Sequence, residues 1–130
     1  MKPLAIRKGA LGKEYADQEI ICRQGEPGNC MYVIQSGDVV VLREEDGVEV
    51  AVGELGTGDV VGEMAIFEKQ PRSATVRSKG RSRIMTLDKR AFLRRVHEDP
   101  SLAYKIMQKL SGTIRRLNEE LEQLKRNQEY

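Results

Sequence analysis

The chain has 130 residues, of which 39% are hydrophobic and 32% charged, a composition typical of one ordinary globular domain. Its net charge of +2 is too small to indicate a nucleic-acid surface, and no apolar run approaches the length of a membrane span. Residues 1–6 lack the apolar region and cleavage site of a secretory signal. We therefore expect a cytoplasmic domain with no nucleic-acid partner and no membrane association.

Short β-branched runs separated by glycine-rich turns fill the first half of the chain. They cover residues 19–23, 31–35, 39–42 and 48–55 and are typical of antiparallel strands. Asp46-Gly47, between the last two runs, is a strong signal for a two-residue type I′ hairpin turn. Further on, two more strands are predicted at residues 74–78 and 82–87. The pattern predicts a mainly β protein with some helix, built on an antiparallel jelly-roll barrel.

Residues 61–67 and 71–76 form the most informative stretch of the sequence. Gly62 lets the backbone come close to a ligand, and the apolar residues after Glu63 can form one helical turn whose free N–H groups point at an anion. Arg72 supplies a planar cation whose paired donors fit two phosphate oxygens. The carboxylate of Glu63 can accept a hydrogen bond from a ribose hydroxyl. These residue types in this order predict a site for a cyclic phosphodiester and its ribose.

Two helices are predicted after the strands. Asp88 can cap a helix that continues to about Glu98. Asp99 and Pro100 are an N-cap followed by proline at the first helical position, so a second, longer helix begins there. We therefore divide the chain into an N-terminal segment (residues 1–18), a ligand-binding jelly roll (19–88) and C-terminal helices (89–130).

The last helix carries an apolar stripe with alternating spacings of four and three residues. Its members are Ala103, Met107, Leu110, Ile114, Leu117, Leu121 and Leu124. This is a heptad seam, in which Glu120 and Lys125 fall on g and e positions and can pair between two chains. A stripe of this kind can also pack a helix on its own barrel. Its length favours a homodimer, because it continues past what a small barrel needs.

The stretch around residues 61–76 resembles the phosphate-binding cassette of cyclic nucleotide-binding domains, the family of the catabolite activator protein and of kinase and channel regulatory domains. The likeness rests on Gly62, Glu63, Ala65, Arg72, Ala74 and Thr75, and Met64 replaces the family's usual Leu or Ile. Residues 24–37 are similar to the family's turn-strand-turn signature.

The resemblance implies a role for each cassette residue. Glu63 would bind the ribose 2′-hydroxyl and Arg72 the exocyclic phosphate oxygens, and backbone amides would complete the cradle. The amides are those of Met64, Ala65 and Ser73. With Gly62 and Ala74, these residues form the predicted ligand-binding set, and the ligand is a cyclic nucleotide with no further cofactor.

The resemblance also implies that the long C-terminal helix closes over the base. Leu117 and Asn118 stand where the catabolite activator type has a Thr-Ser pair that reads adenine, and Leu117 cannot hydrogen-bond. Asn118 offers a donor and an acceptor, and Arg115 can instead stack on the ring, so these two are the candidate lid residues. Either can equally be a solvated helix residue. Ser73 favours cAMP over cGMP, because the kinase branch that binds cGMP has Thr at this position.

The sequence thus favours a cyclic nucleotide sensor that signals to an unidentified effector protein by movement of its C-terminal helices. One alternative is a metal-dependent cupin-type enzyme, which usually needs several histidines, whereas His97 is the one histidine of the chain. A second is an interaction scaffold of the same fold that binds no ligand, but such chains usually lose the Glu or the Arg. Cys22 and Cys30 lack metal-ligand spacing, and we expect buried, reduced thiols. No catalytic residue and no metal site are predicted.

Overall fold

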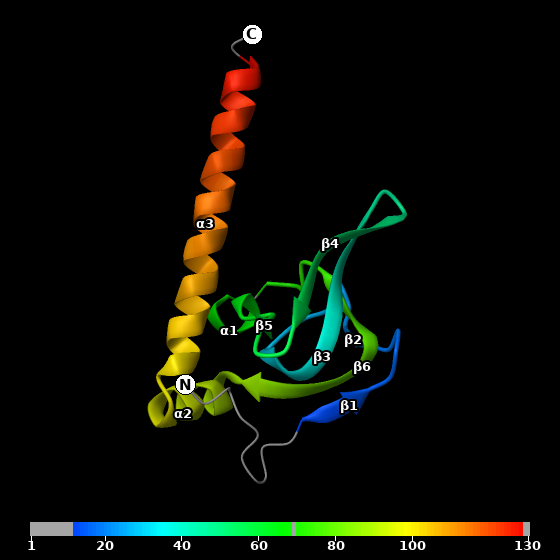
Figure 1. Ribbon diagram of the computed structural model, residues 1–130, viewed down its shortest axis with the longest axis vertical. Coiled ribbons are helices and arrows are strands. Elements are labelled where there is room, and N and C mark those ends of the chain that lie inside the picture. The colour runs from blue at the N-terminus through cyan, green and yellow to red at the C-terminus, as the bar shows by residue number, and fades with distance from the viewer. Residues whose placement is uncertain (1–11, 69, 129–130) are drawn as a thin grey trace. The chain divides into compact units, whose positions relative to one another are not determined.

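The computed structural model describes residues 12–68 and 70–128. Six strands and three helices follow one another in the described part of the chain (Figure 1). They are β1 (Lys13–Tyr15), β2 (Ile20–Cys22), β3 (Cys30–Glu45), β4 (Val48–Gly56), β5 (Val60–Val61), α1 (Met64–Phe67), β6 (Thr75–Asp88), α2 (Lys89–Glu98) and α3 (Ser101–Gln128). The predicted fold class, mainly antiparallel β with helices, is confirmed.

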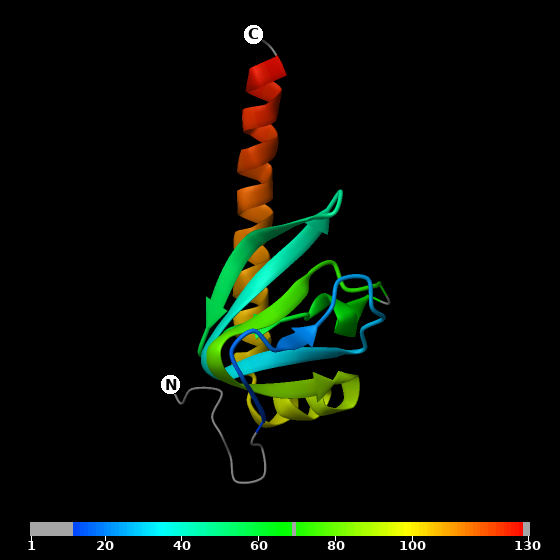
Figure 2. The ribbon, with the colours of Figure 1, turned by 90° about the vertical axis from the view of Figure 1, so that its right-hand side faces the viewer.

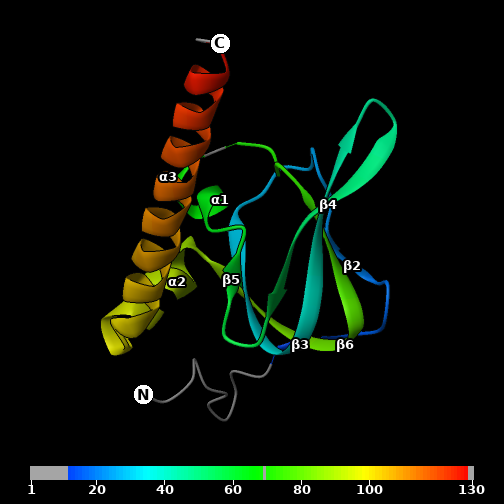
Figure 3. The same ribbon diagram turned by 45° about the horizontal axis from the view of Figure 1, so that its top comes forward.

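The sheet is organised around its two longest strands, β3 and β6. They pair antiparallel from Cys30 opposite Asp88 to Leu42 opposite Thr75. β4 and β5 pair with β3, and β1 and β2 pair with β6, so that six strands form one sheet. Figure 3 shows these strands curling around a common interior. Among the described residues the pairing does not close into a ring, so the structure is an open roll where the sequence predicted a barrel.

Four of the predicted strands merge into two in the structure, β3 and β6. Each was expected as two strands interrupted by a glycine turn, but β3 runs through Gly37 and β6 runs through Gly80. Gly37 has a φ of 90° and Gly80 a φ of 73°, and the ladder shifts register on both sides of Ser36. These glycines therefore bend the strands without ending them, because a residue without Cβ enters the left-handed region at little cost.

The hairpin between β3 and β4 forms as predicted. Asp46 and Gly47 both have positive φ, 54° and 78°, as a type I′ turn requires, and Glu45 pairs with Val48 across the turn. Figure 2 shows this hairpin projecting from the rest of the sheet. β1 and β5 were not predicted, since these short strands, unlike β2, are not part of a longer run of strand-forming residues.

Because of β1, the sheet begins earlier in the chain than predicted. The three residues of β1 pair with β6, inside the segment 1–18 that the sequence analysis placed before the jelly roll. The first part of that segment, residues 1–11, lies outside the described residues.

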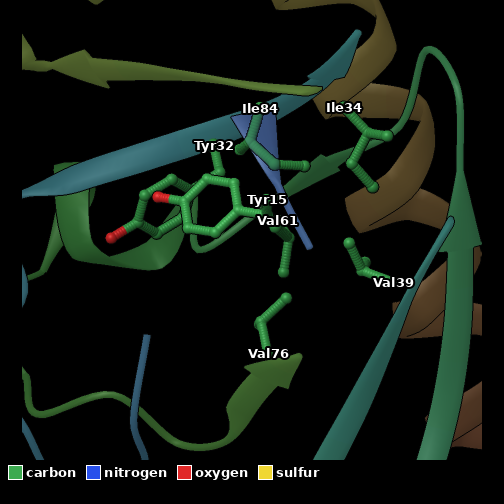
Figure 4. Close-up of a cluster of buried hydrophobic side chains, with 7 residues drawn as sticks. All are labelled: Tyr15, Tyr32, Ile34, Val39, Val61, Val76 and Ile84. Atoms are coloured by element: carbon green, nitrogen blue, oxygen red, sulfur yellow. The ribbon is translucent and has the colours of Figure 1, made fainter. Parts of the chain in front are cut away.

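The interior of the roll holds a cluster of seven buried side chains (Figure 4). They are Tyr15, Tyr32, Ile34, Val39, Val61, Val76 and Ile84. Tyr32 and Ile34 are two residues apart on β3 and so face the same side of the sheet. The residues between and beside them, Met31 and Val33, are fully buried as well, so this part of β3 is covered on both faces. Cys22 and Cys30 pack against the cluster as free thiols, half-buried where buried thiols were predicted.

The helices begin where the sequence places their caps. The Asp88 carboxylate accepts a hydrogen bond from the amide of Ala91 at 2.7 Å, and the Asp99 carboxylate accepts one from the amide of Ser101 at 3.0 Å. The described chain divides into two compact units, with the boundary between Leu93 and Arg94 within α2. None of the described helices contains an apolar stretch long enough to cross a membrane.

Candidate functional site

The predicted cassette forms a tight turn between β5 and β6. Gly62 directly follows β5 with a φ of 77°, and Glu63 is the N-cap residue of the single-turn helix α1. Glu63 is only 5% exposed, although it is a carboxylate, whereas Met64 is exposed and Ala65 half-buried. Buried acidic side chains are uncommon unless they have a partner. The turn therefore holds a buried carboxylate next to a glycine whose positive φ would strain other residues.

The side chain of Arg72 is buried as well, at 8% exposure. Its Nη2 donates to the carbonyl oxygen of Cys30 at 2.6 Å and contacts the Cys30 Sγ at 3.3 Å. Its Nη1 donates to the carbonyl oxygen of Gly62 at 3.3 Å. The guanidinium carbon also lies 5.1 Å from the centroid of the Tyr32 ring, within cation–π range. Backbone oxygens, one sulfur and an aromatic face thus surround this cation.

Two glycines leave the space that the Arg72 side chain occupies. A Cβ on Gly28 would stand 2.5 Å from the Arg72 Nε, and a Cβ on Gly62 would collide with the Arg72 Nη1. Gly28 comes from the loop before β3, and Gly62 follows β5. The arginine therefore passes between two segments that are far apart in the sequence, and a side chain at either glycine would displace it.

The backbone of Arg72 is fixed by that same loop. Its amide donates to the Glu26 carbonyl at 2.8 Å, and its carbonyl accepts from the Gly25 amide at 2.8 Å. Pro27 and Pro71 form an isolated antiparallel bridge beside these bonds. Residues 24–37, which the sequence analysis used only as a second signature, hence contribute directly to holding Arg72 in place.

The other residues of the predicted site differ in their exposure and contacts. The Ala65 amide, predicted to face a phosphate, donates to the Gly62 carbonyl at 3.1 Å, the same oxygen that accepts from Arg72. Ser73 is exposed and Ala74 half-buried in the turn that leads into β6. The candidate lid residues, Arg115 and Asn118, are exposed on α3 in the second compact unit, and their role stays a prediction.

Three residues with contacts to Arg72 had no role in the sequence analysis: Gly28, Cys30 and Tyr32. All three lie in the quoted signature, but only Gly28, after Pro27 in a turn, carried a signal of special backbone use. Burial raises the pKa of Tyr32, and the hydrogen bond with the Cys30 side chain raises it further. Tyr32 therefore stays neutral at physiological pH and offers Arg72 the face of a neutral ring.

Chemically, the site presents a forked cation and a carboxylate, both buried, on two short connected segments. A buried guanidinium can exchange its carbonyl acceptors for the oxygens of an anion, with stronger, charge-assisted hydrogen bonds. A carboxylate accepts hydrogen bonds from hydroxyl groups. The described residues contain no cluster of three or more side chains suited to a metal ion. The arrangement suits a ligand that combines a phosphate with a sugar.

Comparison with known proteins gives the family. Residues 12–99 match the cyclic nucleotide-binding domain family, so the chain belongs to it. The chain is 41% identical, over 80 residues, to a cAMP-dependent protein kinase regulatory subunit from Mucor circinelloides, which covers 62% of this chain and 19% of that protein. The chain thus spans about a fifth of that relative's length.

Solved structures agree with this assignment. The catabolite activator protein of Thermus thermophilus superposes with a TM-score of 0.78 at 25% identity, covering 89% of this chain and 55% of that one. A cGMP-bound EAL enzyme, Bd1971, superposes with a TM-score of 0.62 at 31% identity, covering 88% of this chain and 31% of that one. The antiparallel roll is therefore shared with a bacterial regulator and with one part of a larger enzyme.

The contact between Tyr32 and Arg72 makes a prediction about positioning. Replacing Tyr32 by Leu removes the ring face, and we expect cyclic nucleotide affinity to fall by about 0.5–2 kcal/mol. Tyr32→Phe keeps the face and should bind like the parent chain. Isothermal titration calorimetry measures both variants, and urea unfolding checks their stability. Equal losses in the two variants would assign the effect to the hydroxyl group instead of the ring.

Proposed function

We propose that the domain binds a cyclic nucleotide through Arg72 and Glu63 and acts as a regulatory sensor and not as an enzyme. The observation that carries this proposal is the Arg72 guanidinium, buried between Gly28 and Gly62 with its backbone fixed on both sides. Such a fork matches two oxygens of one phosphate. The buried carboxylate of Glu63 supplies an acceptor for the ribose 2′-hydroxyl.

We propose cAMP as the preferred ligand. The kinase regulatory subunit among the relatives is described as cAMP-dependent, and Ser73 is the residue that favours cAMP. Bd1971 was solved with cGMP, so cGMP is the ligand to compare with it directly.

Ligand exchange at Arg72 suggests how binding starts a conformational change. The Gly62 carbonyl accepts hydrogen bonds both from Arg72 and from the Ala65 amide in α1. A phosphate that takes over the Arg72 donors frees this oxygen and allows the turn of α1 to shift. In our proposal residues 19–88 bind the nucleotide, and residues 89–130 move and transmit the signal to an effector protein. A ligand drives such a shift only by binding the two states with different affinity.

We also propose that the domain forms a homodimer through α3. Met107, Ile114, Leu117, Leu121 and Leu124 are all more than half exposed in the single chain. A row of large apolar side chains at heptad spacing is stabilised by a matching row, which a second copy supplies. Glu120 lies 3.9 Å from Arg116 in its own helix, so this g-position carboxylate already has a partner within the chain. The apolar seam, not the predicted charge pair, is therefore the main support.

Arg72→Ala tests the phosphate contact. Loss of the charge-assisted hydrogen bonds should weaken cAMP binding by about 2–4 kcal/mol. Arg72→Lys keeps the charge without the fork and should give an intermediate loss. Calorimetry with cAMP, cGMP and a cyclic dinucleotide measures affinity and selectivity. The matched control is Arg81→Ala, because the Arg81 side chain is 82% exposed. Parent-like affinity in a folded Arg72→Ala protein would refute the site.

Glu63 is tested by changing the ligand and the protein together. The 2′-deoxy analogue of cAMP should bind the parent chain more weakly, and Glu63→Gln should reduce that difference. We expect a coupling energy of about 1–2 kcal/mol in the double cycle of protein and ligand variants. Strictly additive losses would mean that Glu63 does not contact the 2′-hydroxyl.

Leu121→Glu tests the dimer. A carboxylate in the apolar seam should shift the protein to the monomer, because two buried charges would face each other. Gln123→Glu adds the same charge at an exposed position outside the seam and should leave the mass unchanged. Sedimentation velocity compares the variants with the parent chain. A parent protein that is monomeric at every concentration measured would refute the proposed homodimer.

A further inference from the structure

A cavity of about 290 Å³ adjoins Arg72, and two cysteines line it. Its described lining includes Arg72, Gly28, Tyr32 and both Cys22 and Cys30, but none of residues 62–65, 73 or 74. Cys22 and Cys30 also pack against the same buried cluster of the roll. The cavity therefore brings both thiols of the chain to the binding arginine on a side not formed by the cassette.

The two cysteines also bracket the loop that holds Arg72. Cys22 ends β2 and Cys30 begins β3, and the loop between them supplies Gly25 and Glu26 for the two backbone bonds to Arg72. The ladder of β2 with β6 shifts register between Ile20 and Cys22. Residues at the ends of strands, beside an irregular ladder, move more easily than residues within it.

Contact with the guanidinium distinguishes the two thiols. The Cys30 Sγ lies 3.3 Å from the Arg72 Nη2, and the Cys30 carbonyl oxygen accepts from the same nitrogen at 2.6 Å. Any new bond at this sulfur must change the surroundings of the binding arginine. Burial raises the pKa of Cys22, which disfavours direct attack of this thiol on peroxide, because the thiolate is the nucleophile. The first step is therefore assigned to Cys30, and Cys22 reacts second, through its small thiolate fraction. Both thiols are free in the structure.

We propose that Cys22 and Cys30 form a peroxide-sensitive thiol pair, whose oxidation to a disulfide draws Cys30 away from Arg72 and weakens anion binding. In the first step the Cys30 sulfur attacks hydrogen peroxide, which gives a sulfenic acid and releases water. The Cys22 thiolate then attacks that sulfur, forming the S–S bond and releasing a second water. Two thiols are oxidised by two electrons in total, and the peroxide is reduced to two water molecules.

The chemical part of this proposal is tested by mass spectrometry on the full chain, without nucleotide. Reduced protein is treated with hydrogen peroxide, and free thiols are then blocked with N-ethylmaleimide. We expect a product that has lost two hydrogen atoms, takes up no N-ethylmaleimide and returns to the starting mass with dithiothreitol. Cys22→Ser should yield no disulfide. A pair that stays reduced, a lone sulfenic acid on Cys30 in the parent chain or a bridge between two molecules would overturn the proposal.

The regulatory part rests on the proposed function and is measured by calorimetry with cAMP. The oxidised parent chain should bind about ten- to a hundredfold more weakly than the reduced chain, with recovery in dithiothreitol. Cys22→Ser, which cannot form the disulfide, should lose less affinity than the parent chain after the same treatment. Equal affinity of the reduced and oxidised chains, or the same loss in Cys22→Ser, would refute the regulation and leave the binding site intact. Failure of the reduced parent to bind any cyclic nucleotide would instead refute the proposed function.

Discussion

The guanidinium of Arg72 is a cation held out of water, and such a group is stable only where the surrounding structure satisfies its donors. Here two segments, the start of β3 and the glycine after β5, accept from the guanidinium, and a third, the loop before β3, holds the backbone of Arg72. Cys30 and the loop before it lie far from Gly62 and Arg72 in the sequence. The curl of the sheet brings them together, because β3 pairs with β5 on one part of its length and with β6 along most of it.

This requirement explains features that look unrelated along the chain. Gly28 and Gly62 lack side chains where the arginine passes. Tyr32 places the face of its ring against the guanidinium, in a cation–π contact. Tyr32 belongs at the same time to the buried cluster of the roll (Figure 4). The hydrophobic core and the candidate site therefore share a residue, and the position of Arg72 depends on core packing as well as on hydrogen bonds.

Much of this arrangement was predictable from the sequence, and the failures have physical reasons. The Asp46-Gly47 hairpin and the caps at Asp88 and Asp99 rest on local chemistry, which single residues reveal. The continuity of β3 through Gly37 was missed, because the same glycine signal marks both a turn and a bulge that bends a strand.

The candidate site was predictable only in part for a related reason. Glu63 and Arg72 carry charged groups, and the residue type alone indicates which ligand groups they can bind. Cys30 acts through its backbone carbonyl and Tyr32 through a ring face, and neither property depends on a sequence motif. The two backbone hydrogen bonds between Arg72 and residues 25–26 join loops that are distant in the sequence, so only the folded chain reveals them.

The carbonyl oxygens on Arg72 have one further consequence. Because neutral groups of the protein satisfy the guanidinium, its burial does not depend on an anion, and the domain can persist folded in its resting form. In the function that we propose, anion binding would be an exchange reaction in which a phosphate replaces a carbonyl, and the affinity would measure only the difference between the two. On this proposal, a fall in nucleotide concentration would return Arg72 to its carbonyl acceptors without leaving a buried charge unsatisfied, as reversible signalling requires.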